Sequence, residues 1–177
     1  MNFDEIYEKY FGRVYKFIRV KTLNSEESED IAVKVFENVY RNIDRFCEEK
    51  GSMDIWIFSI ARNEINSYYR SKNIQAISMD SIGEISDNSN SPEDILNKKI
   101  ENKRLQQALE ILNENERFVI SCKYAAGLKN KEIGKLMGIS SSNVGVVLFR
   151  SMKKLKKQLA CDFENKNEDW RDRYEQV

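Results

Sequence analysis

The sequence predicts an all-α protein of two small helical domains joined by a flexible acidic linker, with a helix-turn-helix in the C-terminal domain. Three observations predict this class. Apolar residues recur every three or four positions over most of the 177 residues, extended alternating stretches are absent, and the single proline, Pro92, stands between two periodic regions. The expected domains span 1–73 and 92–160, with a linker at 74–91 and a polar tail at 161–177.

The first domain is expected to contain three helices. The first, at residues 3–20, carries apolar residues at helical spacing, among them Phe3, Tyr7 and Phe11. Asn24, followed by Glu27 three residues later, predicts the cap of a second helix with its buried stripe at Ile31, Val35, Phe36, Val39 and Ile43. Ser52 predicts the cap of a third helix at about 53–72. A domain of about 73 residues is near the lower size limit for a self-sufficient core.

The linker and the second domain follow the same logic. Residues 74–91 are polar and acidic, and Ser91 with Pro92 restarts a helix at about 92–112. Asn113 with Glu116 forms another capping box, which begins a helix at 114–126. Helices at 130–137 and 141–160 complete the domain, and the tail is expected to be frayed or a weak terminal helix.

Residues 129–160 have the spacing of a helix-turn-helix. Gly134 allows two helices to approach closely, Gly138 forms the turn, and Val144 is the apolar residue expected to pack the base of the second helix into the core. That helix carries an apolar stripe (Val144, Leu148, Met152, Leu155, Leu159) and a basic side (Arg150, Lys153, Lys154, Lys157). The pattern favours contact with a DNA backbone. Helix pairs in other bundles share the glycine turn, and lysines often only solvate a helix, so the spacing leaves both interpretations open.

The charge distribution favours nucleic-acid binding. The net charge is zero, yet residues 96–160 carry 14 basic and 5 acidic side chains, whereas residues 76–95 carry 5 acidic and none basic. The acidic linker can also screen the basic region within the chain.

The composition argues against several other classes. Histidine is absent, as are phosphate-binding glycine loops, so we expect no catalytic residues, no metal site and no cofactor, and hence no enzyme. The sequence contains no run of about 18 apolar residues, so we expect no membrane span, and we expect no secretion signal after Met1. Three distant cysteines without a CxxC pair fit reduced thiols in the cytoplasm.

Three segments of the first domain resemble the small extracytoplasmic-function (ECF) group of the sigma-70 family of initiation factors. They are FDEIYEKYFGRVYKFI at 3–18, EDI at 29–31 with VFENVYRNI at 35–43, and WIFSIARN at 56–63 with Tyr69 and Arg70. The second domain resembles region 4 of that family. Together the matches cover about 3–73 and 96–159, in the family's order.

The resemblance implies a role for each surface. The second helix would bind the clamp of the RNA polymerase core through Glu29, Asp30, Val33, Lys34, Glu37 and Asn38. The loop before the third helix, and that helix, would bind the melted −10 element through Glu49, Lys50, Ser52, Met53, Arg62, Asn63, Asn66, Ser67 and Arg70. The second domain would bind the beta flap, and would read the −35 element through Ser141, Ser142, Asn143, Val146, Arg150, Lys153, Lys154 and Lys157. An anti-sigma factor is a further expected partner.

Some residues have second interpretations. Trp56 and Tyr69 fit a role in the core, Arg62 can instead pair with a carboxylate inside its own domain, and Asn143 can be a helix cap. The family usually has Gln-Glu where this chain has Val33 and Lys34, so the expected polymerase-binding surface differs from the family pattern at these two positions, and Lys34 reverses one charge on it.

We therefore predict an alternative sigma factor, with two alternatives. A stand-alone helix-turn-helix regulator leaves the first-domain match unexplained. A polymerase-binding adaptor fits the recognition helix, which Gly145 makes less basic and weakens by about 1 kcal/mol relative to alanine. Only a sigma factor would support promoter-dependent initiation by core polymerase alone.

Overall fold

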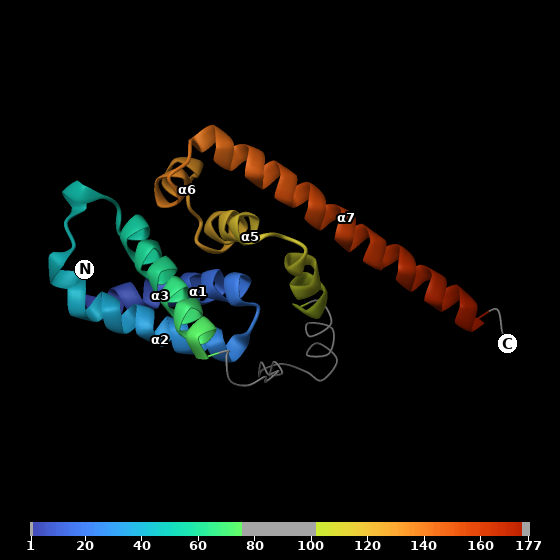
Figure 1. Ribbon diagram of the computed structural model, residues 1–177, viewed down its shortest axis with the longest axis horizontal. Coiled ribbons are helices and arrows are strands. Elements are labelled where there is room, and N and C mark those ends of the chain that lie inside the picture. The colour runs from blue at the N-terminus through green and yellow to red at the C-terminus, as the bar shows by residue number, and fades with distance from the viewer. Residues whose placement is uncertain (1, 76–101, 175–177) are drawn as a thin grey trace.

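The computed structural model describes residues 2–75 and 102–174, and within these ranges it is helical without a strand, as the sequence predicts (Figure 1). The first unit contains α1 (Phe3–Thr22), α2 (Ser25–Asn42), the short 3-10 helices η1 (Ile43–Arg45) and η2 (Glu48–Lys50), and α3 (Met53–Gln75). The second contains a helix at 102–110, then α5 (Glu114–Ile120), the π-helical turn η3 (Ser121–Ala125), α6 (Asn130–Met137) and α7 (Ser141–Tyr174). Most of the predicted linker and the helix start at Ser91 and Pro92 lie outside the described residues.

Side-chain caps explain where the helices begin. The Oδ1 of Asn24 accepts a hydrogen bond from the backbone N–H of Glu27 at 3.1 Å, which confirms the predicted start of α2. Asn113 and Glu116 exchange hydrogen bonds of 2.9 and 3.0 Å, the predicted capping box of α5. Each cap satisfies backbone N–H groups that the first turn of a helix leaves unpaired.

Two glycines form the helix-turn-helix, as the spacing predicts. A Cβ on Gly134 would lie 2.7 Å from the carbonyl oxygen of Ile139, so only glycine permits this close approach. Gly138 has φ +71°, the left-handed conformation that ends α6. Val144 is fully buried at the base of α7. The turn between α6 and α7 is therefore short and sterically determined.

Two helices differ from the predicted ranges. The helix expected at 114–126 is α-helical only to Ile120 and widens into the π-helical turn η3. Gly127, with φ +70°, then turns the chain toward α6. The last helix does not end near residue 160: the backbone of α7 continues to Tyr174, so part of the predicted tail is helical (Figure 1).

The two units share one hydrophobic core. Phe17 of α1 and Phe58 of α3 pack edge to face with ring centroids 5.3 Å apart, and Phe17 packs likewise on Phe118 of α5 at 5.7 Å. The buried cluster continues through Cys122 and Ile133 of the second unit. A smaller core, formed by Ala108, Leu109, Leu112, Ile120 and Leu155, holds the second unit's own helices together. No helix in the described ranges is long and apolar enough to cross a membrane.

Polar contacts reinforce this packing between the units. The Arg13 guanidinium donates to the main-chain carbonyl of Ala126 and to Asp54 Oδ1, the latter at 2.5 Å. It also lies 5.4 Å from the ring centroid of Phe58. One arginine thus ties α1 both to α3 and to the end of η3. The spacing of apolar residues along the sequence contains no signal for this contact.

Candidate nucleic-acid interface

The outer face of α2 carries the residues expected to bind polymerase. Glu29, Asp30, Val33, Lys34 and Glu37 are exposed, with Val33 at 59%. Ile31, Val35 and Val39 are buried on the inner face of the same helix, so the helical period leaves the expected polymerase-binding residues on the outer face.

Two members of this set contact α3. The amide nitrogen of Asn38 donates to Glu64 Oε1 at 3.0 Å, and Asn38 is only partly exposed. The ammonium of Lys34 lies 5.8 Å from the ring centroid of Tyr68. Lys34, one of the two residues that differ from the expected Gln-Glu pair, therefore lies beside α3.

An aromatic groove borders this face of α2. Tyr7 and Phe11 of α1, with Val33, Phe36 and Tyr40 of α2, line a groove of about 350 Å³. Tyr7 is 41%, Phe11 37% and Tyr40 65% exposed. The sequence predicts Tyr7 and Phe11 on the apolar face of the first helix, and apolar spacing alone does not separate this exposed stripe from the core. The spacing of Phe3, Tyr7 and Phe11 at four-residue intervals is the signal for it.

One stripe of α3 contains four of the residues expected to bind the −10 element. Asn63, Asn66, Ser67 and Arg70 are exposed and follow each other at helical spacing. In the preceding loop Glu49 and Ser52 are exposed and Met53 is partly buried, while the side chain of Lys50 lies outside the described residues. The Oγ of Ser52 accepts a hydrogen bond from the backbone N–H of Ile55 at 3.4 Å, near the start of α3.

Arg62 differs from the rest of the −10 set. Its guanidinium donates to the main-chain carbonyl of Leu136, at the end of α6, and lies 5.2 Å from the ring centroid of Phe118. The described residues contain no ion pair of Arg62 with a carboxylate. The alternative role of Arg62, an ion pair with a carboxylate of its own domain, is therefore not observed among the described residues. Arg62 instead contacts the second unit.

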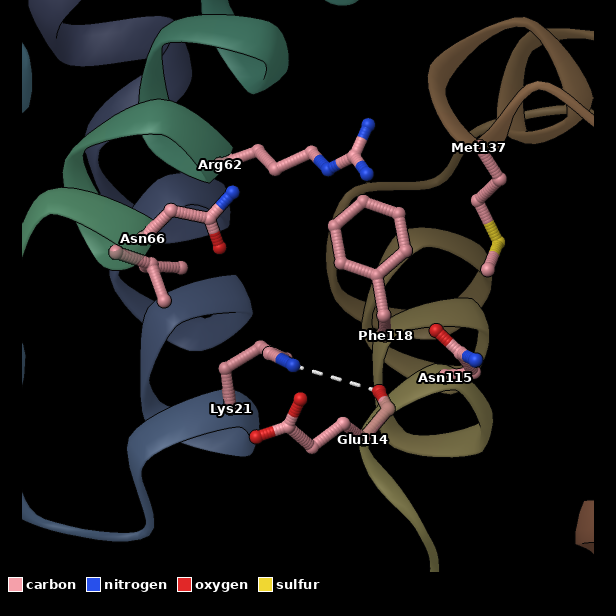
Figure 2. Close-up of a pocket in the computed structure, with 8 residues that line it drawn as sticks. Lys21, Arg62, Asn66, Glu114, Asn115, Phe118 and Met137 are labelled. Atoms are coloured by element: carbon pink, nitrogen blue, oxygen red, sulfur yellow. Dashed lines mark hydrogen bonds between the residues drawn. The ribbon is translucent and has the colours of Figure 1, made fainter. Parts of the chain in front are cut away.

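A cavity of about 140 Å³ lies where Arg62 meets the second unit (Figure 2). Arg62 and Asn66 of α3 and Lys21 of α1 reach it from one side, and Phe118 and Asn115 of α5 from the other (Figure 2). The Lys21 ammonium donates to the main-chain carbonyl of Glu114 at 3.3 Å and lies 5.8 Å from the ring centroid of Phe118. The cavity therefore brings two cations to one aromatic ring.

The charges around the cavity are unbalanced. Burial lowers the pKa of Lys21 most, the nearby Glu114 carboxylate opposes that shift, and the positive charges of Arg117 and Arg62 lower the pKa further. Lys21 did not appear among the sequence candidates, because a lysine near the end of a helix has no distinguishing spacing.

The start of α7 presents the residues expected to read the −35 element. Ser141, Ser142 and Asn143 are exposed, and so are Arg150, Lys153 and Lys157. The Oγ of Ser140 accepts a hydrogen bond from the backbone N–H of Asn143 at 3.1 Å. The side chain that caps α7 is therefore that of Ser140, and Asn143 is not the cap. Val146 is 46% exposed, and Phe149, which is not among the residues expected to bind DNA, is 73% exposed.

Lys154 has a structural partner. Its ammonium lies 2.7 and 2.9 Å from the two carboxylate oxygens of Glu116 on α5. Burial of Glu116 acts to raise its pKa, but hydrogen bonds from Lys154 and from the Asn113 backbone N–H hold the pKa below its ordinary value. Lys154 thus links α7 to α5, and its contact with DNA stays a prediction.

Comparison with known proteins points to one family. The family model Sigma-70 region 2 matches residues 6–74, and the model Sigma-70, region 4 matches residues 102–155. The ECF RNA polymerase sigma factor SigM of Bacillus subtilis (strain 168) is 33% identical over 159 residues, covering 88% of this chain and 94% of SigM.

Solved structures agree on the fold. The sigma factor RpoE of Bartonella quintana, in complex with the anti-sigma factor NepR, is similar with a TM-score of 0.70 and 17% identity, over 90% of this chain and 98% of RpoE. CnrH, in complex with the cytosolic domain of CnrY, is similar with a TM-score of 0.67 and 18% identity, over 90% of this chain and 88% of CnrH.

Proposed function

The chain belongs to the sigma-70 family and is an alternative RNA polymerase sigma factor of the ECF group, and we propose how its surfaces divide the work of initiation. Residues 1–73 form the core-binding and −10 domain, and residues 92–160 form the −35 domain. Residues 74–91 link the two domains, and residues 161–177 form the tail. Sigma factors are non-enzymatic regulators, and this chain contributes no catalytic group to initiation.

The α2 face binds the clamp of the polymerase core. Glu29, Asp30, Val33, Lys34 and Glu37 support this role because they are exposed on one side of a helix whose other side is buried. Asn38 positions this face through its hydrogen bond to Glu64 on α3.

The α3 stripe guides the melted −10 strand. Single-stranded DNA is bound by basic groups that follow the backbone and by polar groups that read the edges of unstacked bases. Asn63, Asn66, Ser67 and Arg70 supply both kinds of group on one exposed face, and Arg62 borders it. The loop residues Glu49, Lys50, Ser52 and Met53 hold a flipped base at the start of the same helix.

The α7 face reads the −35 element while the second domain binds the beta flap. Asn143 can form a bidentate pair with adenine in the major groove, and Ser141 and Ser142 lie beside it at the start of the helix. Arg150, Lys153, Lys154 and Lys157, farther along α7, contact phosphates, and Val146 contacts a base methyl group.

The observation that carries this assignment is that each helical unit presents an exposed helix face of basic and polar residues, on α3 in the first unit and on α7 in the second. The test is run-off transcription with purified core polymerase and the full chain. We expect promoter-dependent transcripts that require both the −10 and −35 elements. If the chain is instead an adaptor or a stand-alone regulator, core polymerase supplied with this chain as the only factor should give no promoter-dependent transcript.

We propose that the chain acts in the cytoplasm, where RNA polymerase and promoter DNA are found. The RpoE structure holds an anti-sigma factor. By analogy we propose that this chain is also held by an anti-sigma protein, which pull-down with the full chain can identify.

A further inference from the structure

We infer that Lys21, Arg62 and Asn66 form a binding site for one unstacked nucleotide of the melted promoter strand, and that the second unit fills this site in the unbound chain. The occupant is Phe118, with the main-chain carbonyls of Glu114 and Leu136. The inference rests on the proposed role of α3 in guiding that strand. It adds Lys21 to the strand-binding residues and makes Phe118 an internal competitor of DNA.

The geometry at Phe118 resembles that of a bound base. The Arg62 guanidinium and the Lys21 ammonium lie 5.2 and 5.8 Å from the centroid of its ring (Figure 2). Aromatic rings of bases attract arginine in the same way when single strands bind to proteins. Phe118 is 6% exposed, so its ring is almost completely enclosed at this junction.

The carbonyl oxygens stand where phosphate oxygens would bind. Each cation donates a hydrogen bond to a neutral main-chain carbonyl, Lys21 to Glu114 and Arg62 to Leu136. A carbonyl accepts the hydrogen bond but does not neutralise the charge. A phosphate does both, and hydrogen bonds between ionised partners are about twice as strong as neutral ones. The side chain of Asn66, which borders the cavity, can bind a base edge.

The local electrostatics favour exchange of this occupant for an anion. Lys21 is half-buried, and the positive charges of Arg62 and Arg117 act against its protonated form, with the Glu114 carboxylate as the opposing charge. An anionic strand would stabilise both cations. The second unit offers Lys21 one opposing charge, the Glu114 carboxylate, and offers Arg62 only a carbonyl dipole and the Phe118 ring.

Promoter binding requires the two units to separate. Elements centred near −10 and −35 are about 25 base pairs apart, which corresponds to roughly 85 Å along the duplex. Phe17 and Phe118, one from each unit, are in ring contact at 5.7 Å. A chain that reads both elements must therefore break this contact, and doing so uncovers Lys21 and Arg62 for the strand.

The first test measures binding of a fluorescent AT-rich 12-nucleotide single strand to the full chain by anisotropy. Phe118→Ala should bind it at least tenfold more tightly than the wild type. Adding Lys21→Gln to Phe118→Ala should weaken binding severalfold and lower the salt slope by about 0.7, the value for one lost phosphate contact. Lys16→Gln is the matched control, because Lys16 is an exposed lysine on α1 that does not line the cavity. A folded Phe118→Ala that binds no more tightly than the wild type overturns the inference.

A second measurement leaves Phe118 in place. Cys122 is fully buried beside α1, and it lies near enough to Arg62 and Lys21 for their positive charges to oppose the rise that burial causes in the pKa of its thiol. The rate at which a thiol reagent labels Cys122 therefore reports separation of the two units. With Cys47→Ser and Cys161→Ser, saturating oligonucleotide should accelerate labelling of Cys122 severalfold. Lys21→Gln should reduce this acceleration. An unchanged labelling rate at saturation also overturns the inference.

Run-off transcription on the same preparations separates this inference from the proposed function. Active run-off with no effect of Phe118→Ala on strand binding rejects the internal competitor alone. Tight strand binding by Phe118→Ala without run-off activity of the wild type supports the site and rejects the role in initiation.

Discussion

At the scale of single residues, Glu116 shows how one carboxylate can hold a domain together. It receives hydrogen bonds from its own capping partner Asn113 and from Lys154 on α7, and it is 8% exposed. It therefore joins the start of α5 to the middle of the recognition helix. The spacing of Asn113 and Glu116 predicts the capping role, but no spacing predicts the pairing with Lys154, because a lysine on an exposed helix face has the same spacing whether it contacts DNA or a carboxylate.

The lowered pKa of Glu116 makes a prediction for stability against pH. A carboxyl whose folded pKa is depressed adds stability above its unfolded pKa, near 4.5, and loses it as pH falls through the folded pKa. Lys154→Met should lower the free energy of unfolding at pH 7 by about 1–2 kcal/mol and reduce the additional loss below pH 4.5. Urea unfolding between pH 3 and 7 measures both. Lys153→Met, an exposed neighbour, should follow the wild-type curve, whereas parallel curves for Lys154→Met and the wild type would reject the linkage.

Asn143 and Lys153 should separate sequence reading from backbone attraction. Asn143→Ala should relax base preference at one −35 position by about 1–3 kcal/mol, because Ser140 rather than Asn143 caps the helix. Lys153→Ala should weaken all sequences similarly and lower the salt slope by about 0.9. A −35 substitution series at two salt concentrations distinguishes them. If Asn143→Ala leaves the base preference across the −35 element unchanged, other residues of α7 must determine the specificity.

At the scale of elements, each helix divides into a buried face and a face that remains for partners. On α2 the exposed set includes Asp30 and Glu37, which have no part in the core. The double substitution Asp30→Arg with Glu37→Arg should abolish co-purification with core polymerase while the far-ultraviolet circular dichroism stays unchanged. Glu8→Arg on the exposed side of α1 is the matched control and should leave co-purification intact. Normal recovery of core polymerase by the folded double variant would contradict the clamp assignment.

Two glycines of the helix-turn-helix should respond to alanine in opposite directions. A Cβ on Gly145 would meet the side-chain nitrogen of Asn130 at 3.8 Å, an ordinary contact, so Gly145→Ala should stabilise the protein by about 1 kcal/mol. A Cβ on Gly134 would meet a backbone oxygen at 2.7 Å, so Gly134→Ala should destabilise it. For a chain of this size, about 1 kcal/mol shifts the melting temperature by roughly 2–4 °C, which calorimetry resolves. A lowered melting temperature for Gly145→Ala would mean that this turn of α7 does not tolerate a side chain.

At the scale of the whole molecule, the two units form a closed pair in which Arg62 contacts both. Asn63, one residue later, is exposed on the adjacent face of α3. Substitution of Asn63 therefore tests guidance of the DNA strand alone, whereas substitution of Arg62 also changes the contact between the two units.

Asn63→Ala should reduce open-complex formation on a duplex promoter and leave thermal stability unchanged. Arg62→Ala should reduce open-complex formation and also lower thermal stability, because it removes the hydrogen bond to Leu136 and the contact with Phe118. A promoter with a pre-melted bubble should restore part of the activity of both. Permanganate footprinting measures melting, and wild-type footprints from both variants on duplex promoters would reject strand guidance by α3.

The sequence by itself determined where α2 and α5 begin, the caps of these two helices and the helix-turn-helix. Each of these depends on residues within about four positions of one another, as with Asn113 and Glu116 or with Gly134 and Gly138, so the local order of side chains is sufficient. The exposed faces of α2, α3 and α7 follow from the same periodicity, which is why most candidate residues lie on the surface.

Only the tertiary structure decided what the units do to each other. Lys21, Arg62 and Phe118 are far apart along the chain, and no spacing rule links a lysine at the end of one helix to an arginine in the middle of another. They meet at one cavity because the apolar faces of α1, α3 and α5 share a single core, and burial of apolar surface does not depend on sequence separation. The pairing of Lys154 with Glu116 has the same origin, since packing of α7 on α5 brings the lysine to the carboxylate.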